Sequence, residues 1–144
     1  MADYSMLTEL LNLSNVTVVH YQLVGPSQIN LFVESTLPMA LCPNCQQPSS
    51  SVHDVGEPQM LRDLSIWDRR CWLRIAPRRF KCANCHNTFV ERLAWREAER
   101  DNSLRYEQHV YQRARKEPLT QIAKDEGLSE EAVQGIFERW AKKR

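Results

Sequence analysis

Cys42-Pro43-Asn44-Cys45 and Cys82-Ala83-Asn84-Cys85 are the two stretches that decide the fold of this chain. Each stretch places two thiols on one tight turn, and 36 residues separate the two pairs. Asn44 and Asn84 stand where we expect such a turn to need a left-handed residue. Two CxxC turns supply the four sulfur ligands that tetrahedral Zn²⁺ prefers, whereas one alone is shared with redox motifs. We therefore predict one structural Zn²⁺ held by Cys42, Cys45, Cys82 and Cys85.

The alternatives to this site follow from the remaining cysteine and the nearby histidines. A closed shell of four cysteines has no open position, which favours a structural role over a catalytic or redox one. An odd cysteine count and the lack of a secretory signal argue against disulfides. His53 and His86 could replace a ligand, but four cysteines already complete the shell. Cys71 alternates with Leu73 and Ile75 on one strand face, so we expect it in the core.

Charge is distributed unevenly along the 144 residues, although the net charge is only +1. Residues 1–61 contain five acidic residues and no Lys or Arg, so residues 62–144 hold all 19 basic residues. Such polarity suits a chain whose second part meets an anionic partner. No apolar run approaches the ~18 residues of a membrane span. With no signal peptide either, we expect a cytoplasmic protein with no membrane partner.

Strand patterns dominate the first 90 residues, after a short helix predicted over residues 5–14. The predicted strands are residues 16–24, 29–34, 60–66, 70–75 and 87–90. The first two form a hairpin, and the next two turn near Asp68. Residues 46–60 are predicted to be a polar loop. Because zinc would stand where a core would be, we expect a strong chelator to unfold residues 42–90.

From residue 91 onward the pattern becomes helical. A helix capped by Asn102 or Ser103 is expected to run to Lys116 and to end before Pro118. A second helix covers residues 119–126, and a third runs from a Ser129 cap to about residue 142. The positions expected inside are Leu104, Tyr111 and Ala114 of the first helix, then Ile122, Ala123, Leu128, Val133 and Ile136. With Gly127 in the turn, this spacing is typical of a helix-turn-helix, and the alternative is a three-helix cluster packed on itself.

Together these elements predict an α+β protein in three parts. Residues 1–40 form an N-terminal helix and β-hairpin, and residues 41–92 form a four-cysteine zinc ribbon. Residues 93–144 form a helical helix-turn-helix domain.

Several short motifs carry a resemblance to a known family. They are Leu31-Phe-Val-Glu-Ser35, Cys42-Pro-Asn-Cys45, Ser51-Val-His-Asp54, Leu61-Arg-Asp-Leu64, Arg78-Arg-Phe-Lys-Cys82, Cys85 and Phe89-Val-Glu91. Over nearly its whole length the chain resembles the N-terminal part of transposases of the ISL-three insertion-sequence family. In that family the region looks like the DNA-binding part, a zinc ribbon followed by a helix-turn-helix, and it precedes an RNase H-like catalytic domain that uses acidic residues and Mg²⁺.

The resemblance implies a DNA-binding module, and we expect the catalytic domain of the family to be missing from this chain. The sequence ends at Arg144, directly after the third predicted helix, and no segment remains to build a catalytic sheet. We therefore expect a non-enzyme. Its implied partner is double-stranded DNA, most naturally the ends of a transposon. Because such transposases act as multimers, the resemblance also implies a homodimer or another protein partner.

A basic stretch, residues 69–81, is the first candidate DNA contact. Its candidate residues are Arg69, Arg70, Arg74, Arg78, Arg79 and Lys81, interleaved with Trp72 and Phe80. On a strand, Arg70, Trp72 and Arg74 share one face, which could follow phosphates. The alternative is that these charges offset the net charge of about −2 on a zinc tetrathiolate.

The third predicted helix is the second candidate contact. Gln134, Arg139, Lys142 and Lys143 suit DNA, whereas the outward carboxylates of Glu130, Glu131 and Glu138 do not. This leaves two hypotheses. One is a zinc-dependent DNA-binding module derived from a transposase. The other is a standalone protein-interaction adaptor or transcriptional regulator that keeps the helix-turn-helix for protein contact.

Overall fold

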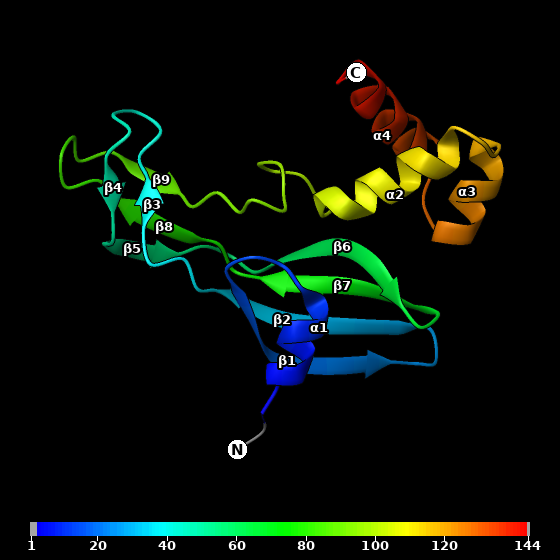
Figure 1. Cartoon of the computed structure of the whole chain (residues 1–144), viewed down its shortest axis with the longest axis horizontal. Coiled ribbons are helices and arrows are strands. Elements are labelled where there is room, and N and C mark those ends of the chain that lie inside the picture. Colours follow the sequence, from blue (N-terminus) through cyan, green and yellow to red (C-terminus); the bar gives the residue numbers. More distant parts are fainter. Residues whose placement is uncertain (1–2, 144) are drawn as a thin grey trace.

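The computed structural model describes residues 3–143 and confirms an α+β fold, with a β-rich part followed by C-terminal helices (Figure 1). The helices are α1 (Ser5–Leu11), α2 (Leu104–Ala114), α3 (Leu119–Glu126) and α4 (Glu130–Lys142). The strands are β1 (Val16–Val24), β2 (Gln28–Ser35), β3 (Ala40–Leu41), β4 (Pro48–Ser49), β5 (Val52–Val55), β6 (Gln59–Ile66), β7 (Arg69–Ile75), β8 (Arg78–Lys81) and β9 (Thr88–Val90). No helix within residues 3–143 is long and apolar enough to cross a membrane.

Two hairpins join side by side to form the largest sheet, in the order β1-β2-β7-β6. Both predicted hairpins, β1–β2 and β6–β7, are antiparallel, and β2 pairs with β7 in parallel. Trp67 and Asp68 form the β6–β7 turn with φ of 43° and 68°, the left-handed values that a two-residue hairpin turn requires. The sheet thus unites residues 16–35 with residues 59–75, although the predicted domain boundary at residue 40 separates them.

The core of this sheet is formed by alternate residues of β1, β2 and β7, together with Leu61 of β6 and Leu11 of α1. Its buried residues are Leu11, Val16, Val18, Ile29, Leu31, Val33, Leu61, Cys71, Leu73, Ile75, Leu93 and Trp95. Cys71 is fully buried, as expected from its alternation with Leu73 and Ile75. Helix α1 ends earlier than predicted, because Asn12 takes a left-handed conformation with φ of 53°. Leu93 and Trp95 show that the segment after β9 also belongs to this core.

The zinc-ribbon part consists of the β3–β4 hairpin and a three-stranded sheet in the order β5-β8-β9 (Figure 1). Its core is small and consists of Ala40, Phe80 and Phe89 together with the cysteines. The predicted polar loop at residues 46–60 is wrong in part, because β4 and β5 lie within it. Its Ser, His and Asp residues hide the strand pattern, and β5 is held by pairing with β8, which is distant in sequence.

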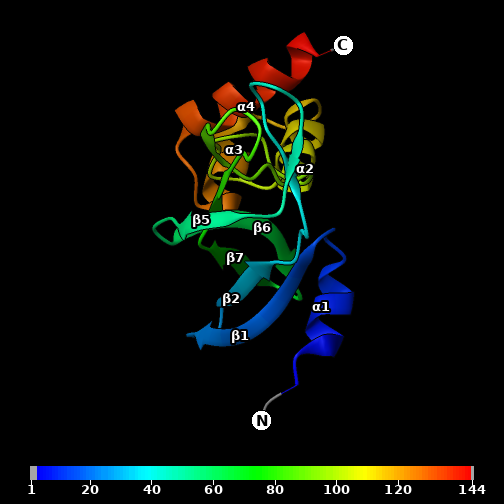
Figure 2. The ribbon, with the colours of Figure 1, turned by 90° about the vertical axis from the view of Figure 1, so that its left-hand side faces the viewer.

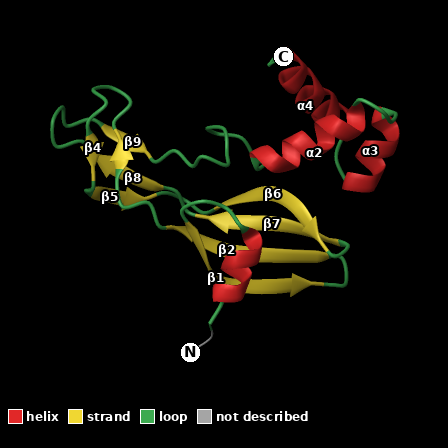
Figure 3. Ribbon diagram, in the orientation of Figure 1, coloured by secondary structure: helices red, strands yellow, loops and turns green. Residues whose placement is uncertain are grey.

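The helical part contains the three predicted helices (Figure 3), but α2 ends at Ala114, two residues before the predicted end at Lys116. The Ser103 and Ser129 hydroxyls accept from the Tyr106 and Ala132 amides, at 3.2 and 3.0 Å. Gly127 ends α3 with φ of 69°, as the turn requires. Ile122, Ala123, Val133 and Ile136 are buried as predicted, whereas Leu128, which was also expected inside, is only half-buried against them. In α2 the buried residues include Tyr106 and Val110, whereas Leu104 and Ala114 are only half-buried.

Candidate metal centre and nucleic-acid interface

The four predicted ligands converge on one point. The sulfur atoms of Cys42, Cys45, Cys82 and Cys85 all lie within 4.8 Å of one another. The Cys42–Cys85 and Cys45–Cys82 sulfur distances are 3.6 and 3.4 Å. Tetrahedral ligands about 2.3 Å from Zn²⁺ would stand about 3.8 Å apart, so this spacing fits a single ion. The cluster is consistent with one structural zinc ion.

The two cysteine turns are built alike. In the first turn the Cys42 amide donates to the Gln47 carbonyl at 3.0 Å, and the Gln46 amide donates to the Cys42 carbonyl at 2.8 Å. Cys82, His86 and Asn87 repeat these two bonds in the second turn at 2.8 and 2.9 Å. The left-handed residues are therefore Gln46 and His86, with φ of 65° and 63°. The expectation that Asn44 and Asn84 take this role is wrong, because the turn closes one residue after each pair.

Asn44 and Asn84 instead act on the opposite turn. The Asn44 carboxamide donates to the sulfur of Cys85 at 3.5 Å, and this bond is the largest influence that lowers the pKa of Cys85. The Asn84 side chain lowers the pKa of Cys45 in the same way. Donors of this kind stabilise the thiolate, which is the form that binds metal.

Cys71 is chemically distinct from the four ligands. Burial raises its pKa to about 12, so its thiol stays protonated at neutral pH. It lies in the core of the large sheet and not in the zinc-ribbon core. The structure thus agrees with the interpretation of Cys71 as a small core residue.

Two of the predicted DNA-contacting arginines are engaged within the protein. Arg78 donates to the Glu91 carboxylate and to the Leu37 carbonyl, with Nη2 distances of 3.0 and 2.7 Å. Arg70 donates to the Asp125 carbonyl at 2.9 Å, beneath the turn that Gly127 forms. Arg78 also donates to the Ser35 hydroxyl at 3.1 Å and so fixes the ribbon to the end of β2, while Arg70 fixes the sheet to α3.

The other predicted basic residues lie at the surface. Arg69 donates to the Gly25 carbonyl at 2.9 Å, and the Arg74 guanidinium lies 5.3 Å over the Phe32 ring. Arg79 forms an ion pair with Asp54 whose two side chains are 46% and 42% exposed. Lys81 is exposed and its side chain makes no hydrogen bond or ion pair within the described residues. The basic stretch thus divides into structural arginines and available cations.

Helix α4 carries its predicted contacts along a mixed surface. Arg139 bonds to Glu107 at 3.0 Å and Lys143 to Glu97 at 3.2 Å, while Lys142 is exposed. Gln134 donates to Glu138 at 2.7 Å. Glu130 and Glu131 are exposed at the N-terminus of the helix, where carboxylates are favourable for the helix itself.

Sequence reasoning missed a buried polar network between the sheet and the helices. Asp63 of β6 is 1% exposed and accepts from Ser103 at 2.7 Å and from Arg105 at 2.9 and 2.6 Å. Arg62, which is 4% exposed, donates to the backbone and the side chain of Glu126 and lies 4.7 Å from the Trp72 ring. The sequence signal for this network was the adjacent charged pair Arg62 and Asp63 inside an otherwise strand-like stretch. Charged side chains that are buried in a sheet need partners from another part of the chain.

A four-cysteine ribbon followed by three helices with a glycine turn defines a zinc-ribbon and helix-turn-helix protein. Residues 38–85 match the family model described as the zinc-finger of transposase IS204/IS1001/IS1096/IS1165, and residues 92–141 match the helix-turn-helix domain of transposase family ISL3. The chain therefore carries the N-terminal zinc-ribbon and helix-turn-helix region of ISL3-family transposases. Searches of curated proteins and of solved structures gave no match.

Proposed function

We propose that the chain is a zinc-dependent module that binds double-stranded DNA, with transposon ends as its natural target. The observation that carries this proposal is the pair of family matches, because zinc-finger and helix-turn-helix domains of transposases are kinds of domain that bind DNA. The arrangement of α3, Gly127 and α4 is consistent with it, since a helix-turn-helix presents its second helix to the major groove. The zinc ion has a structural role and holds the ribbon in shape.

Phosphate contacts are assigned to the cations that the fold leaves available. Lys81 and Lys142 are exposed without side-chain partners in the described chain. Arg79 and Lys143 form exposed ion pairs, which are worth about 0–1 kcal/mol and exchange readily for a phosphate. Arg74 is exposed beside Phe32. On α4, Gln134 and Arg139 are the side chains assigned to base edges or to the adjacent backbone.

The test is fluorescence anisotropy of the zinc-loaded protein on generic duplex DNA across a salt series. We expect tight binding at low salt and a linear decrease of log K with log salt. Arg79→Ala and Lys142→Ala should each weaken binding and reduce the slope by about one. Lys116→Ala, which removes the same charge in the turn after α2, is the matched control. An absence of binding even at low salt would reject the proposal.

A second candidate function is favoured by the carboxylates of α4. Glu130, Glu131 and Glu138 are all exposed, and phosphates would repel them. A helix-turn-helix kept for protein contact would make the chain an adaptor or transcriptional regulator. This candidate expects a basic protein partner that is lost when Glu130→Lys and Glu131→Lys are combined. On the DNA-binding proposal the same double variant should instead bind DNA more tightly.

A further inference from the structure

We infer that the zinc-ribbon turns, the linker between β9 and α2, and α4 contact a single DNA duplex in one fixed geometry. This inference rests on the proposed DNA-binding function and adds to it a bipartite target and a linker contact at Arg92. The supporting observation is that the four-stranded sheet is bonded both to the zinc ribbon and to the helical part, which fixes the two modules relative to each other.

The two modules face the same side of the molecule. The loops that hold the cysteines and helix α4 both rise above the four-stranded sheet in Figure 1, and they do so again in the perpendicular view of Figure 2. The linker crosses between them on that side. A duplex lying on this side would therefore meet the ribbon at one end and α4 at the other.

The ribbon is locked to the sheet by a buried carboxylate. Glu91 follows β9, and its side chain is fully buried. It accepts from the Ser35 hydroxyl at 2.6 Å and from Arg78 at 3.0 and 3.1 Å. Arg78 also donates to the Leu37 carbonyl at 2.7 Å. This network ties β8 and the end of β9 to the end of β2, so the ribbon is held in place at its base.

The helical part is locked to the edge strand β6 of the sheet. The Asp101 carbonyl accepts from the Arg62 amide at 2.8 Å, and the Ser103 amide donates to the Arg62 carbonyl at 2.9 Å. These bonds pair the linker with the edge of β6. The buried carboxylate of Asp63 then fixes Arg105 on the first turn of α2. The position of α4 relative to the sheet is thereby set.

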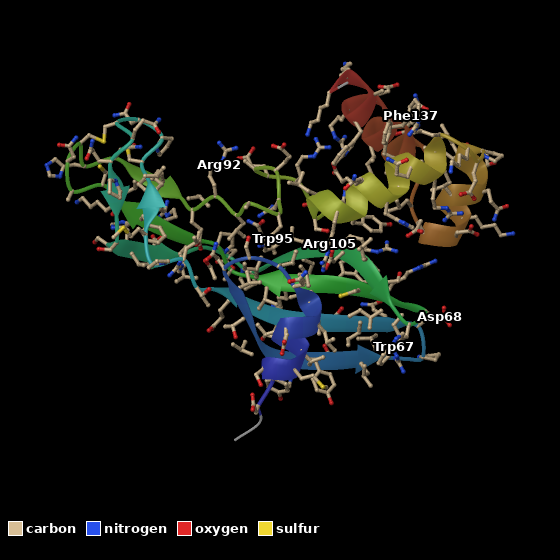
Figure 4. The ribbon with its side chains drawn as sticks, viewed as in Figure 1. Trp67, Asp68, Arg92, Trp95, Arg105 and Phe137 are labelled. Carbon is tan, nitrogen blue, oxygen red and sulfur yellow. The ribbon has the colours of Figure 1, made fainter. Side chains whose placement is uncertain are left out.

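The linker itself is anchored, and one of its cations is left outside. Leu93 and Trp95 are buried in the sheet core, and the Trp95 carbonyl accepts from the Leu104 amide at 2.8 Å. Arg92 is exposed, and its side chain makes no hydrogen bond or ion pair within the described residues. Figure 4 shows Arg92 projecting away from the sheet, between the ribbon and the helices, on the side where α4 lies. It is placed to meet the phosphates between the two modules.

A rigid connection between the two modules constrains the spacing of their DNA sites, whereas a flexible linker does not. Modules on a flexible linker tolerate changes in the spacing of their sites, because the linker adapts. Modules on one rigid body require a constant spacing and a constant rotational phase along the duplex. Insertion of five base pairs would turn one half of the target to the opposite side of the helix, since one turn takes about 10 base pairs.

The first test uses a duplex selected by the whole zinc-loaded chain from a random library. Hydroxyl-radical footprinting should reveal two protected segments joined by a contact at Arg92. Insertion of five base pairs between the segments should weaken binding at least tenfold, and insertion of ten should restore much of it. Binding that tolerates both insertions equally, or protection of one segment only, would overturn the inference and leave the proposed function standing.

The second test is Arg92→Ala, an exposed substitution that should leave the fold intact. We expect the salt slope to fall by about one and protection between the two segments to disappear. Lys116→Ala is the control for the loss of one positive charge. If Arg92→Ala left both the footprint and the salt slope unchanged, the linker would not be part of the DNA interface. A wild-type chain that binds no DNA at all would instead overturn the proposed function itself.

Discussion

Arg78 and Glu91 form an ion pair at the base of the zinc ribbon, where both side chains also bond to Ser35 at the end of β2. Their side chains meet at 3.0 and 3.1 Å, and the Arg78 amide also donates to the same carboxylate at 2.8 Å. The Glu91 side chain is fully buried, whereas that of Arg78 is 22% exposed. Burial alone would raise the pKa of Glu91, but the hydrogen bonds from Arg78 and Ser35 outweigh it and lower the pKa. The carboxylate is therefore stabilised in its charged form.

Replacement of Glu91 by Gln should destabilise the protein in a pH-dependent way. At pH 7 we expect a loss of about 2 kcal/mol in the free energy of unfolding, because Arg78 loses its charged partner. The folded pKa lies below the unfolded value of about 4.3, so the stabilisation is complete above pH 5 and is lost as the pH falls below 4. Urea unfolding of the wild type and Glu91→Gln should give curves that converge in acid. Since loss of zinc affects both proteins, a difference that persisted in acid would contradict this account.

Local features of the chain were predictable from the sequence because each depends on nearby residues. The cysteine spacing predicts the metal cluster, and Ser103 and Ser129 mark the helix starts that the structure has. Gly127 marks the turn for the same reason, since a positive φ is a local requirement. The alternation around Cys71 also predicts its burial correctly.

The long-range features could not be predicted from local pattern. Parallel pairing of β2 with β7 joins segments about 40 positions apart, and no turn residue specifies it. Arg70 and Arg78 belong to a stretch that is typical of a phosphate-binding surface, yet their partners are a helix end and a buried carboxylate. Charge is visible in a sequence, whereas the partner that neutralises it depends on the tertiary fold.

Replacement of Asp63 by Asn should loosen the joint between the sheet and α2. The carboxylate is 1% exposed and accepts three hydrogen bonds from Ser103 and Arg105. A neutral carboxamide leaves the guanidinium without its counter-charge, and we expect a loss of about 3 kcal/mol. Asp68→Asn is the matched control, since Asp68 is exposed in the β6–β7 turn with φ of 68°, which Asn tolerates. Hydrogen exchange should show faster opening of α2 in the first variant only. Equal stability of the two variants would disprove the role of Asp63.

Replacement of Gly127 by Ala should strain the helix-turn-helix for two separate reasons. The φ of 69° is unfavourable for a residue with a Cβ, and that Cβ would lie 2.5 Å from Nη1 of Arg70. We expect a loss of about 2 kcal/mol in thermal or urea unfolding. In the Arg70→Ala background the steric part should disappear, so the same substitution should cost about 1 kcal/mol. Identical costs in both backgrounds would show that Arg70 moves away freely.

Removal of zinc should melt the ribbon and leave the large sheet folded. The ribbon core consists of Ala40, Phe80 and Phe89 with the cysteines, and structural zinc contributes about 10–16 kcal/mol to such folds. The sheet has its own larger core, and β6 and β7 belong to it although they lie between the two cysteine pairs. With a strong chelator, amide resonances of residues 40–55 and 78–90 should lose their dispersion, while those of Leu61 and Leu73 should keep it. Chelation should therefore unfold only the ribbon segments, and not the whole of residues 42–90 as the sequence alone predicts.

Cys82→Ser should reproduce the chelated state, whereas Cys71→Ala should still bind one zinc per chain. Loss of the Leu61 and Leu73 resonances on chelation would mean that the sheet depends on the metal after all.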